Sequence, residues 1–416
     1  MCPPVWWLGD HKGRPYNPNK SGHASMTPQR PLPNTETARP MPPIDAKIER
    51  IETIPLKVKL ERPAAGSTLK LTHRCTIVTR VHTDVGVVGE CFNGNDDETQ
   101  GAIIRLIHEE LEPRLKRRSV AGIEEAWAAT RAATEPFLRD RRIPLRAQSC
   151  VDSALHDAFA KLIGLPLHVL WGRSERRVRV AALGGYYRER NDIAGLAEEV
   201  AELKSHGIHG LKLKVGGRTP REDAERVTAV RRAGGGDFIV AADANQGWTR
   251  EEAVDFARRV ADLGLAWFEE PVKWDNDRRD MALVRALGGI PVSAGQSELS
   301  RFGCRDLMLA DAVDICNFDA SWGGGPTEWR RVAALASSFN VGMMQHIEPQ
   351  IGLMLVGGAA NGRYGEVMLP WRDPFFYSLI AGNAAPFRDG YYALPGKPGW
   401  GMTFDTDYLK HAQRTD

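Results

Sequence analysis

The segment Gly210–Gly217, with the sequence GLKLKVGG, alternates apolar residues with Lys212 and Lys214. In a β-strand, successive side chains point to opposite faces, so both ammonium groups would lie on one face. Taken alone, this alternation favours a strand whose lysine face is exposed to water. The sequence on either side favours a different interpretation, in which the two lysines face a charged site.

The pattern around this segment repeats along the chain. Short apolar strands alternate with amphipathic helices, and the capping-box sequences TPRE at 219–222 and TREE at 249–252 mark two helix starts. The expected strands span about residues 178–183, 210–214, 238–243, 265–269, 290–295, 314–319, 341–346 and 362–366. This alternation predicts an α/β fold, either a (β/α) barrel or a doubly wound open sheet.

The residues at the carboxyl ends of these strands distinguish the two folds. All but the first strand end in a polar residue or are directly followed by one, namely Lys214, Asp243, Glu269, Gln296, Asp319, His346 and Glu366. An open sheet would concentrate its ligand groups at a switch point, whereas a closed barrel brings every strand end to one face. Unpaired buried charges cost on the order of several kcal/mol each, so such a ring needs a compensating ion. We therefore expect a closed barrel with a charged site.

The chain before the barrel divides into two parts. Residues 1–43 are rich in Pro, Asn, Ser, Thr and Gly, and we expect a disordered N-terminal tail. Residues 44–165 contain strand-like runs followed by helical patterns, which predict an α+β capping domain. We expect the barrel to span residues 166–384.

Composition restricts the classes of partner. Fifty-five basic and 53 acidic residues give a formal net charge of +2, which does not indicate a nucleic-acid or membrane surface. The six cysteines form no C-x-x-C pair, and no apolar run approaches the roughly 20 residues of a membrane span. We therefore expect a cytoplasmic protein with reduced thiols, whose partner is a small molecule.

Asp243 in AADANQGW and Glu269 in WFEEP end neighbouring predicted strands. Carboxylates are hard oxygen donors that suit Mg²⁺. For either residue alone, an ion pair with an arginine is an equally good interpretation. Because the two lie at matching strand ends, a metal site is the better one.

In order and spacing, these motifs resemble the enolase superfamily, and within it the mandelate racemase group. The resemblance covers about residues 44–405 and rests on KLK at 212–214, DAN at 243–245, EEP at 269–271, Asp319 before GGG, and His346. It implies a modified (β/α)8 barrel of the (β/α)7β kind with an α+β capping domain. The capping domain would include a C-terminal return segment at about 385–416, which contains PGKPGWGM.

The resemblance also implies catalytic roles. Lys214 would be a base with Lys212 as its electrostatic partner, and His346, paired with Asp319, would be a second acid or base. Glu366 would donate a hydrogen bond to a substrate carboxylate. A lysine base needs a lowered pKa, and burial, Lys212 and a metal ion would each act in that direction.

The same resemblance makes Asp243 and Glu269 ligands of Mg²⁺ and brings Asn245 to the substrate's α-hydroxyl group. The third ligand position, which normally holds a carboxylate, is Gln296 in SAGQSE. An amide oxygen can coordinate Mg²⁺, but the site then has one negative charge fewer. Glu298 is the alternative third ligand.

These features predict an Mg²⁺-dependent enzyme that acts on a 2-hydroxycarboxylate, first of all a dehydratase (lyase) of an acid sugar. A racemase or epimerase of an α-hydroxy acid is the second interpretation and a lactone cycloisomerase the third. A catalytically silent binding protein is the alternative without enzyme activity. The cap segments at 66–74 and 92–98 would close over the substrate, and we expect a homo-oligomer.

Overall fold

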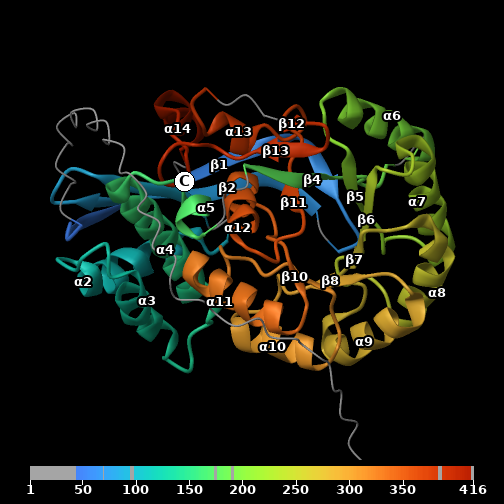
Figure 1. Ribbon diagram of the computed structural model, residues 1–416, viewed down its shortest axis with the longest axis horizontal. Helices are drawn as coiled ribbons and strands as arrows, with labels where there is room; N and C mark the ends of the chain where they lie inside the picture. Colours follow the sequence, from blue (N-terminus) through green and yellow to red (C-terminus); the bar gives the residue numbers. More distant parts are fainter. Residues whose placement is uncertain are drawn as a thin grey trace, which may run out of the picture. The chain divides into compact units, whose positions relative to one another are not determined.

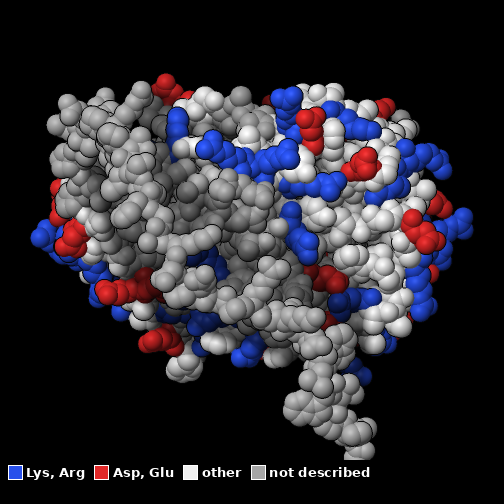
Figure 2. Space-filling model, viewed as in Figure 1, with Lys and Arg blue, Asp and Glu red and all other residues white. Residues whose placement is uncertain are grey.

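The computed structural model describes residues 44–68, 70–93, 98–172, 176–188, 192–382 and 387–413 (Figure 1). The N-terminal tail predicted at 1–43 and most of the cap segment predicted at 92–98 lie outside the described residues. On the face in Figure 2, basic and acidic side chains both occur over the described part of the chain, in keeping with the near-neutral net charge.

Parallel strands form the centre of the structure. They are β4 (Arg177–Gly184), β5 (Gly210–Lys214), β6 (Ile239–Asp243), β7 (Trp267–Glu269), β8 (Val292–Ala294), β9 (Ile315–Cys316), β10 (Gly342–Met343) and β11 (Gly365–Val367). Each pairs in parallel with the next from β4 to β10, and β11 pairs with β4. Met343 bridges to Gly362, just before β11. The sheet therefore closes on itself, which confirms the barrel and rules out the open sheet.

Helices connect these strands and cover the outside of the barrel (Figure 1). They are α6 (Asp192–Ser205), α7 (Pro220–Gly234), α8 (Arg250–Val260), α9 (Asp277–Gly288), α10 (Arg301–Leu309), α11 (Gly325–Ser338) and α12 (Pro349–Gly358). Short 3-10 turns, η3 (Ala261–Leu263) and η4 (Trp274–Asn276), follow α8 and β7. Both predicted capping boxes are present, at Thr219 of α7 and Thr249 of α8. With one helix between each pair of successive strands, the arrangement is (β/α)7β.

The capping part precedes the barrel in the chain. Its antiparallel sheet has the order β1 (Ile48–Ala65), β2 (Lys70–Thr83) and β3 (Val88–Asn93). Its helices are α1 (Gln100–Leu106), η1 (Ile107–Leu111), α2 (Glu112–Leu115), α3 (Ile123–Arg131), η2 (Ala132–Thr134), α4 (Arg142–Ile163) and α5 (Leu167–Leu170). Helix α4 packs so closely on β3 that a Cβ atom at Gly89 would lie 2.1 Å from the carbonyl oxygen of Ala154. Glycine is required there by this close approach.

The C-terminal segment returns to the capping part. It contains α13 (Phe375–Ser378), the antiparallel pair β12 (Phe387–Arg388) and β13 (Tyr391–Ala393), and α14 (Thr406–Ala412). The backbone N–H of Trp400 donates to Asp157 Oδ1 of α4 at 2.8 Å, and its indole Nε1 donates to the Ser153 carbonyl at 3.0 Å. Gln413, just after α14, bridges to Leu56 of β1. These contacts join the two ends of the described chain through the capping part.

Two strands end three residues before the end that the sequence predicted. Strands β9 and β10 end at Cys316 and Met343, so Asp319 and His346 lie in the loops that follow. Asp319 Oδ1 accepts a hydrogen bond from the backbone N–H of Ser321 at 2.7 Å. A side-chain bond of this kind starts a turn and ends the strand pairing.

Candidate functional site

The polar residues predicted at the strand ends lie buried at the carboxyl-terminal end of the barrel. They are Lys212, Lys214, Asp243, Glu269, Gln296, Asp319, His346 and Glu366. Strand register places three of them side by side, because Lys214 pairs with Asp243 and Asp243 pairs with Glu269. The interpretation of Gly210–Gly217 as a strand whose lysine face is exposed to water is therefore wrong, since Lys212 is fully buried.

Lys212 lies between carboxylates from three strands. Its Nζ is 2.7 Å from Glu269 Oε1, 2.5 Å from Glu366 Oε1 and 3.4 Å from Asp243 Oδ2. Burial acts to lower the pKa of Lys212, but these carboxylates outweigh it and raise the pKa well above its usual range. Lys212 therefore remains a cation. Glu366 accepts from Lys212 and from the backbone N–H of Ile347, so the donor role predicted for Glu366 requires that it first gain a proton.

Lys214 is paired with one carboxylate. Its Nζ donates to Asp243 Oδ2 at 2.6 Å. Burial and Lys212 act to lower the pKa of Lys214, as the sequence predicted, but Asp243 outweighs them and raises the pKa above its usual value. The expected fall in the pKa of Lys214 is thus absent from the chain alone, because Lys214 Nζ, at 2.6 Å, lies closer to Asp243 Oδ2 than Lys212 Nζ does, at 3.4 Å.

His346 and Asp319 form the predicted pair. His346 Nδ1 lies 2.8 Å from Asp319 Oδ2, while Asp319 Oδ1 accepts from the backbone N–H of Ser321 and from Gln345 Nε2. A carboxylate in this position favours the tautomer with the proton on Nδ1, which leaves Nε2 as the basic nitrogen. The Trp322 ring packs against the imidazole with 4.9 Å between ring centroids.

Asp243 and Glu269 have the chemistry that a divalent cation requires. Their carboxylates are adjacent in register, and Asp243 Oδ1 accepts from the backbone N–H of Asn245 at 2.9 Å. Among the described residues, no group donates to the buried Asn245 Oδ1, so a further oxygen beside this pair lacks a partner. These hard oxygen donors fit Mg²⁺. In this structure Lys212 and Lys214 engage the carboxylates, and within the described ranges no three acidic, imidazole or thiol groups converge as a metal cluster.

Gln296, predicted as the third metal ligand, contacts a carboxylate outside the predicted ligand set. Its Nε2 donates to Glu270 Oε2 at 2.8 Å, and its Oε1 accepts from Asn317 Nδ2 at 3.2 Å. Glu298, the alternative third ligand, pairs with Arg278 at 2.7 Å. Glu298 is therefore occupied by an arginine outside the ring of strand-end residues.

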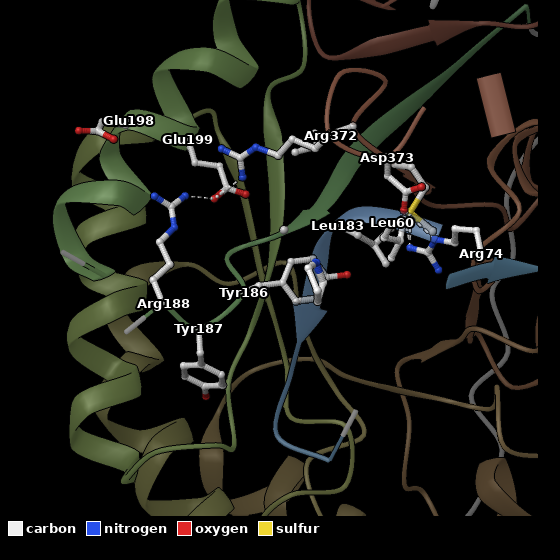
Figure 3. Close-up of a pocket in the computed structure, with 14 residues that line it drawn as sticks. Leu60, Arg74, Leu183, Tyr186, Tyr187, Arg188, Glu198, Glu199, Arg372 and Asp373 are labelled. Carbon is white, nitrogen blue, oxygen red and sulfur yellow. Dashed lines mark hydrogen bonds and ion pairs between the residues drawn. The ribbon is translucent and has the colours of Figure 1, made fainter. Parts of the chain in front are cut away.

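A cavity of about 500 Å³ lies between the capping part and the barrel (Figure 3). On one side Arg74 of β2 donates to Asp373 at 2.7 Å, and on the other Arg188 donates to Glu199 at 2.9 Å. Figure 3 shows Tyr186 between these two pairs. Tyr186 lies close enough to Lys214 to contribute to the raised pKa of that lysine. The cavity is therefore a chamber with an arginine–carboxylate pair on each side.

The turn between β1 and β2 covers the ring. Ser67 Oγ donates to the Ala244 carbonyl at 2.6 Å, and Thr68 Oγ1 donates to the Asn245 carbonyl at 3.0 Å. A Cβ atom at Gly66 would lie 3.3 Å from Asn245 Oδ1. This part of the predicted cap segment thus touches the residue expected to contact substrate.

Comparison with known proteins identifies the family. Residues 50–172 match the family described as Mandelate racemase / muconate lactonizing enzyme, N-terminal domain, and residues 195–408 match Enolase C-terminal domain-like. The chain belongs to the mandelate racemase/muconate lactonizing enzyme family. The resemblance found in the sequence is therefore confirmed.

Relatives in this family differ in reaction. An arabinonate dehydratase of Saccharolobus solfataricus is 31% identical over 79% of this chain and 87% of its own length. A D-galactarolactone cycloisomerase of Agrobacterium fabrum is 32% identical over 89% of this chain and 100% of its own length. A solved mandelate racemase/muconate lactonizing enzyme from a marine actinobacterium, in complex with magnesium, has a TM-score of 0.83 and 44% identity, with 89% and 100% of the two chains covered. The comparisons support Mg-dependent enolase-type chemistry without fixing the overall reaction.

Two groups at the site of this mandelate racemase family member were missed by the sequence analysis. Glu270 follows Glu269 in the EEP motif, and Ser67 lies in the cap turn. The adjacency of two glutamates was the available signal for Glu270. For Ser67 there was no sequence signal beyond its place in a predicted cap segment.

In the described part of the chain, every helix is too short or too polar to cross a bilayer.

Proposed function

We propose that this protein is an Mg²⁺-dependent dehydratase of an acid sugar, in which Lys214 removes the proton beside the substrate carboxylate. The observation that carries the proposal is the burial of Lys214 and the His346–Asp319 pair in the same ring as two carboxylates in register. A proton beside a carboxylate is weakly acidic because its removal creates an enediolate dianion. The ring collects positive and hydrogen-bonding groups where that charge would develop.

In this proposal Asp243 and Glu269 hold the metal, and Gln296 stands at the third position. The bound divalent ion supplies positive charge that stabilises the enediolate. A cation on Asp243 would compete with Lys214 for that carboxylate, which removes the interaction that raises the lysine's pKa. Lys212 adds a second fixed positive charge, and Glu366 holds Lys212 in place.

Two acid/base groups belong to strands that lie apart in the barrel. Lys214 ends β5, and His346 follows β10; in the closed barrel β4 and β11 separate these strands on one side, and β6 to β9 on the other. Lys214 would take the α-proton, and His346, protonated on Nε2, would give a proton to the departing β-hydroxyl group. The product would be a 2-keto-3-deoxy acid.

The same pair of groups favours a second candidate, a racemase or epimerase of an α-hydroxy acid. In that reaction His346 would return a proton to the carbon from the side opposite Lys214. The substrate's β-hydroxyl group would then stay in place, so the products of the two candidates differ in composition.

The proposal is tested by assaying a panel of mono- and diacid sugars with Mg²⁺ and again after chelation. We expect a 2-keto-3-deoxy acid to form from at least one acid, with activity lost on chelation and restored by Mg²⁺. A folded protein that turns over no acid on the panel, with or without the metal, would instead support a catalytically silent binding protein.

A further inference from the structure

A buried cluster joins the end of β3, in the capping part, to the loops that follow β9 and β10. Asn93 Nδ2 donates to Ser321 Oγ at 2.8 Å and lies 3.4 Å from Glu348 Oε2. Ser321 Oγ donates to the same oxygen of Glu348, and all three side chains are buried. The Ser321 backbone N–H donates to Asp319 Oδ1 at 2.7 Å. Ser321 therefore connects Glu348 to the His346–Asp319 pair.

Within the described ranges, both donors to the Glu348 carboxyl group are neutral. They are the Ser321 hydroxyl and the Asn93 amide, and Glu348 Oε1 is buried without any donor. Asn93 Oδ1 is also buried without a donor among these residues. An ionised carboxylate that is buried without a cation is far more costly than a neutral carboxyl group. A proton on Glu348 would remove this cost and supply a donor that the cluster lacks.

The charges around the cluster act in the same direction. Burial first, and then the negative charge of Asp319, raise the pKa of Glu348 well above its usual range, while the Asn93 amide lowers it. The thiols of Cys91 and Cys150 face Glu348 from β3 and α4, and burial raises both of their pKa values, so they stay neutral near pH 7. The remaining charged or titratable groups beside the cluster are His346 and Arg146, and Arg146 of α4 packs over the Trp322 ring at 5.4 Å from its centroid.

The backbone at Glu348 is strained. Ile347 and Glu348 have φ angles of +50° and +51°, in the left-handed region that residues with a side chain, and β-branched ones above all, rarely adopt. Such conformations persist where the surrounding contacts over-determine them, and they cluster at active sites. These two residues directly follow His346. The contacts of Glu348 thus hold the segment of chain that carries the imidazole.

We propose that Glu348 is a neutral carboxylic acid in the folded protein and a positioning residue for the His346–Asp319 pair. The carboxyl group anchors Ser321, whose backbone N–H orients Asp319, and through Asn93 it fastens the capping part behind the pair. With Glu348 neutral, Asp319 is the single negative charge beside His346. The positioning role rests on the proposed function, in which His346 acts as an acid, whereas the proton on Glu348 does not.

Urea titrations of the full chain between pH about 5 and about 7 test the proton without an activity assay. In the unfolded chain a glutamate titrates near about 4.3, so above this pH the unfolded state has lost a proton that the folded wild type keeps. Stability of the wild type should therefore fall relative to Glu348→Gln as the pH rises, by up to about tenfold in the unfolding equilibrium constant per pH unit. Glu109→Gln, at an exposed position of η1, is the matched control and should run parallel to the wild type.

Parallel profiles of wild type and Glu348→Gln would overturn the inference, because an ionised Glu348 has no proton to lose in this range. If Glu348→Gln does not fold, Glu348→Met, which is also uncharged and of similar length, takes its place. Infrared difference spectra of the folded proteins at pH 7 give a second measurement. The carbonyl band of protonated carboxyl groups should be weaker in Glu348→Gln than in the wild type and Glu109→Gln, and equal bands would also overturn the inference.

Turnover of an accepted acid tests the positioning role. Glu348→Ala and Ser321→Ala should each lower kcat by at least about tenfold, the effect of one lost hydrogen bond, with a smaller change in KM, and Glu348→Gln should recover most of the loss. Unchanged kcat in Glu348→Ala would overturn the positioning role and leave the proposed function intact. A wild type without turnover would overturn the proposed function and the positioning role together, while the urea and infrared results would still decide the proton.

Discussion

Lys212 is the residue that holds the charges of the ring together, since it contacts Asp243, Glu269 and Glu366 at once. Removing one partner from a buried ion pair typically costs about 3–5 kcal/mol, because the remaining charge is left without compensation. Lys212→Met should therefore lower the free energy of unfolding by about that amount in urea titrations. Mg²⁺ should raise the melting temperature of this variant more than that of the wild type, since it can neutralise the freed carboxylates.

Lys273, which is exposed, provides the control for this substitution. Lys273→Met should leave both stability and the response to Mg²⁺ unchanged. Equal stability of Lys212→Met and the wild type would show that the ring does not depend on Lys212.

The acid/base roles give a second prediction at this scale. Lys214→Ala and His346→Asn should each lower kcat by at least about a hundredfold, the scale for a positioned acid or base. Their circular dichroism spectra should match the wild type. Lys273→Ala and His411→Asn make the same changes at exposed positions and should keep normal kcat. Near-normal turnover in either site variant would remove that residue from the mechanism.

Sequence reasoning could place Lys214, Asp243 and Glu269 because all three end regular strands that pair in register. It could not find Glu270. Neighbouring residues in a regular strand point to opposite faces, so Glu270 would be expected to face away from Glu269. The strand ends at Glu269, and the left-handed backbone of Glu270 breaks that alternation.

Among the elements, α7 and α8 carry the clearest sequence signals. Thr219 accepts from the backbone N–H of Glu222 at the start of α7, and the Glu222 side chain accepts from Thr219 in return. Removing such a cap costs about 1 kcal/mol. Thr219→Ala should lower the free energy of unfolding by that amount.

Thr228, inside α7, provides the matched control for the cap. Alanine is the better helix former there, so Thr228→Ala should leave stability unchanged or raise it slightly. Equal losses in the two variants would mean that the capping box is not the source of the effect.

Signals of this local kind explain which elements could be predicted. A capping box involves only residues within one helical turn of each other, so both capping boxes could be predicted correctly from the sequence. The ends of β9 and β10 were predicted too late. The side-chain hydrogen bond at Asp319 belongs to a turn after β9, and strand patterning alone does not show where the pairing stops.

At the scale of the whole molecule, helix α4 links the capping part to the barrel. His156 of α4 is buried, and its Nε2 lies 3.0 Å from Thr327 Oγ1 of α11. Burial, assisted by Arg330, lowers the pKa of His156 to about 3. In the unfolded chain a histidine titrates near about 6.5. Between these values the unfolded state binds a proton that the folded state does not, so stability falls as the pH falls.

His156→Gln should therefore remove part of the acid sensitivity. Between pH about 6 and about 4, the slope of unfolding free energy against pH should decrease by up to about 1.4 kcal/mol per unit in this variant. Burial raises the pKa of Asp152 to about 7, so this residue makes stability rise as the pH falls. Asp152 is present in both the wild type and the variant. The difference between their urea titrations thus reports His156, and parallel pH profiles would contradict the assignment.

Barrel closure could be predicted because polar residues recur at one strand end after another. The contacts between the capping part and the barrel could not, because they join residues far apart in sequence. His156 and Thr327 are 171 positions apart, and Arg74 and Asp373 are 299 apart. Neither contact produces a periodic pattern that could be recognised in the sequence.

The central claim is that Lys214 removes the α-proton of a 2-hydroxycarboxylate and that a β-hydroxyl group then leaves. Proton NMR of an accepted acid sugar, incubated with enzyme and Mg²⁺ in heavy water, tests this claim most directly. We expect loss of the α-proton and a 2-keto-3-deoxy acid that carries solvent deuterium at C3, with neither change in Lys214→Ala. Recovery of deuterated hydroxy acid with inverted configuration and no keto acid would contradict dehydration, and retention of the α-proton by every acid would contradict the account as a whole.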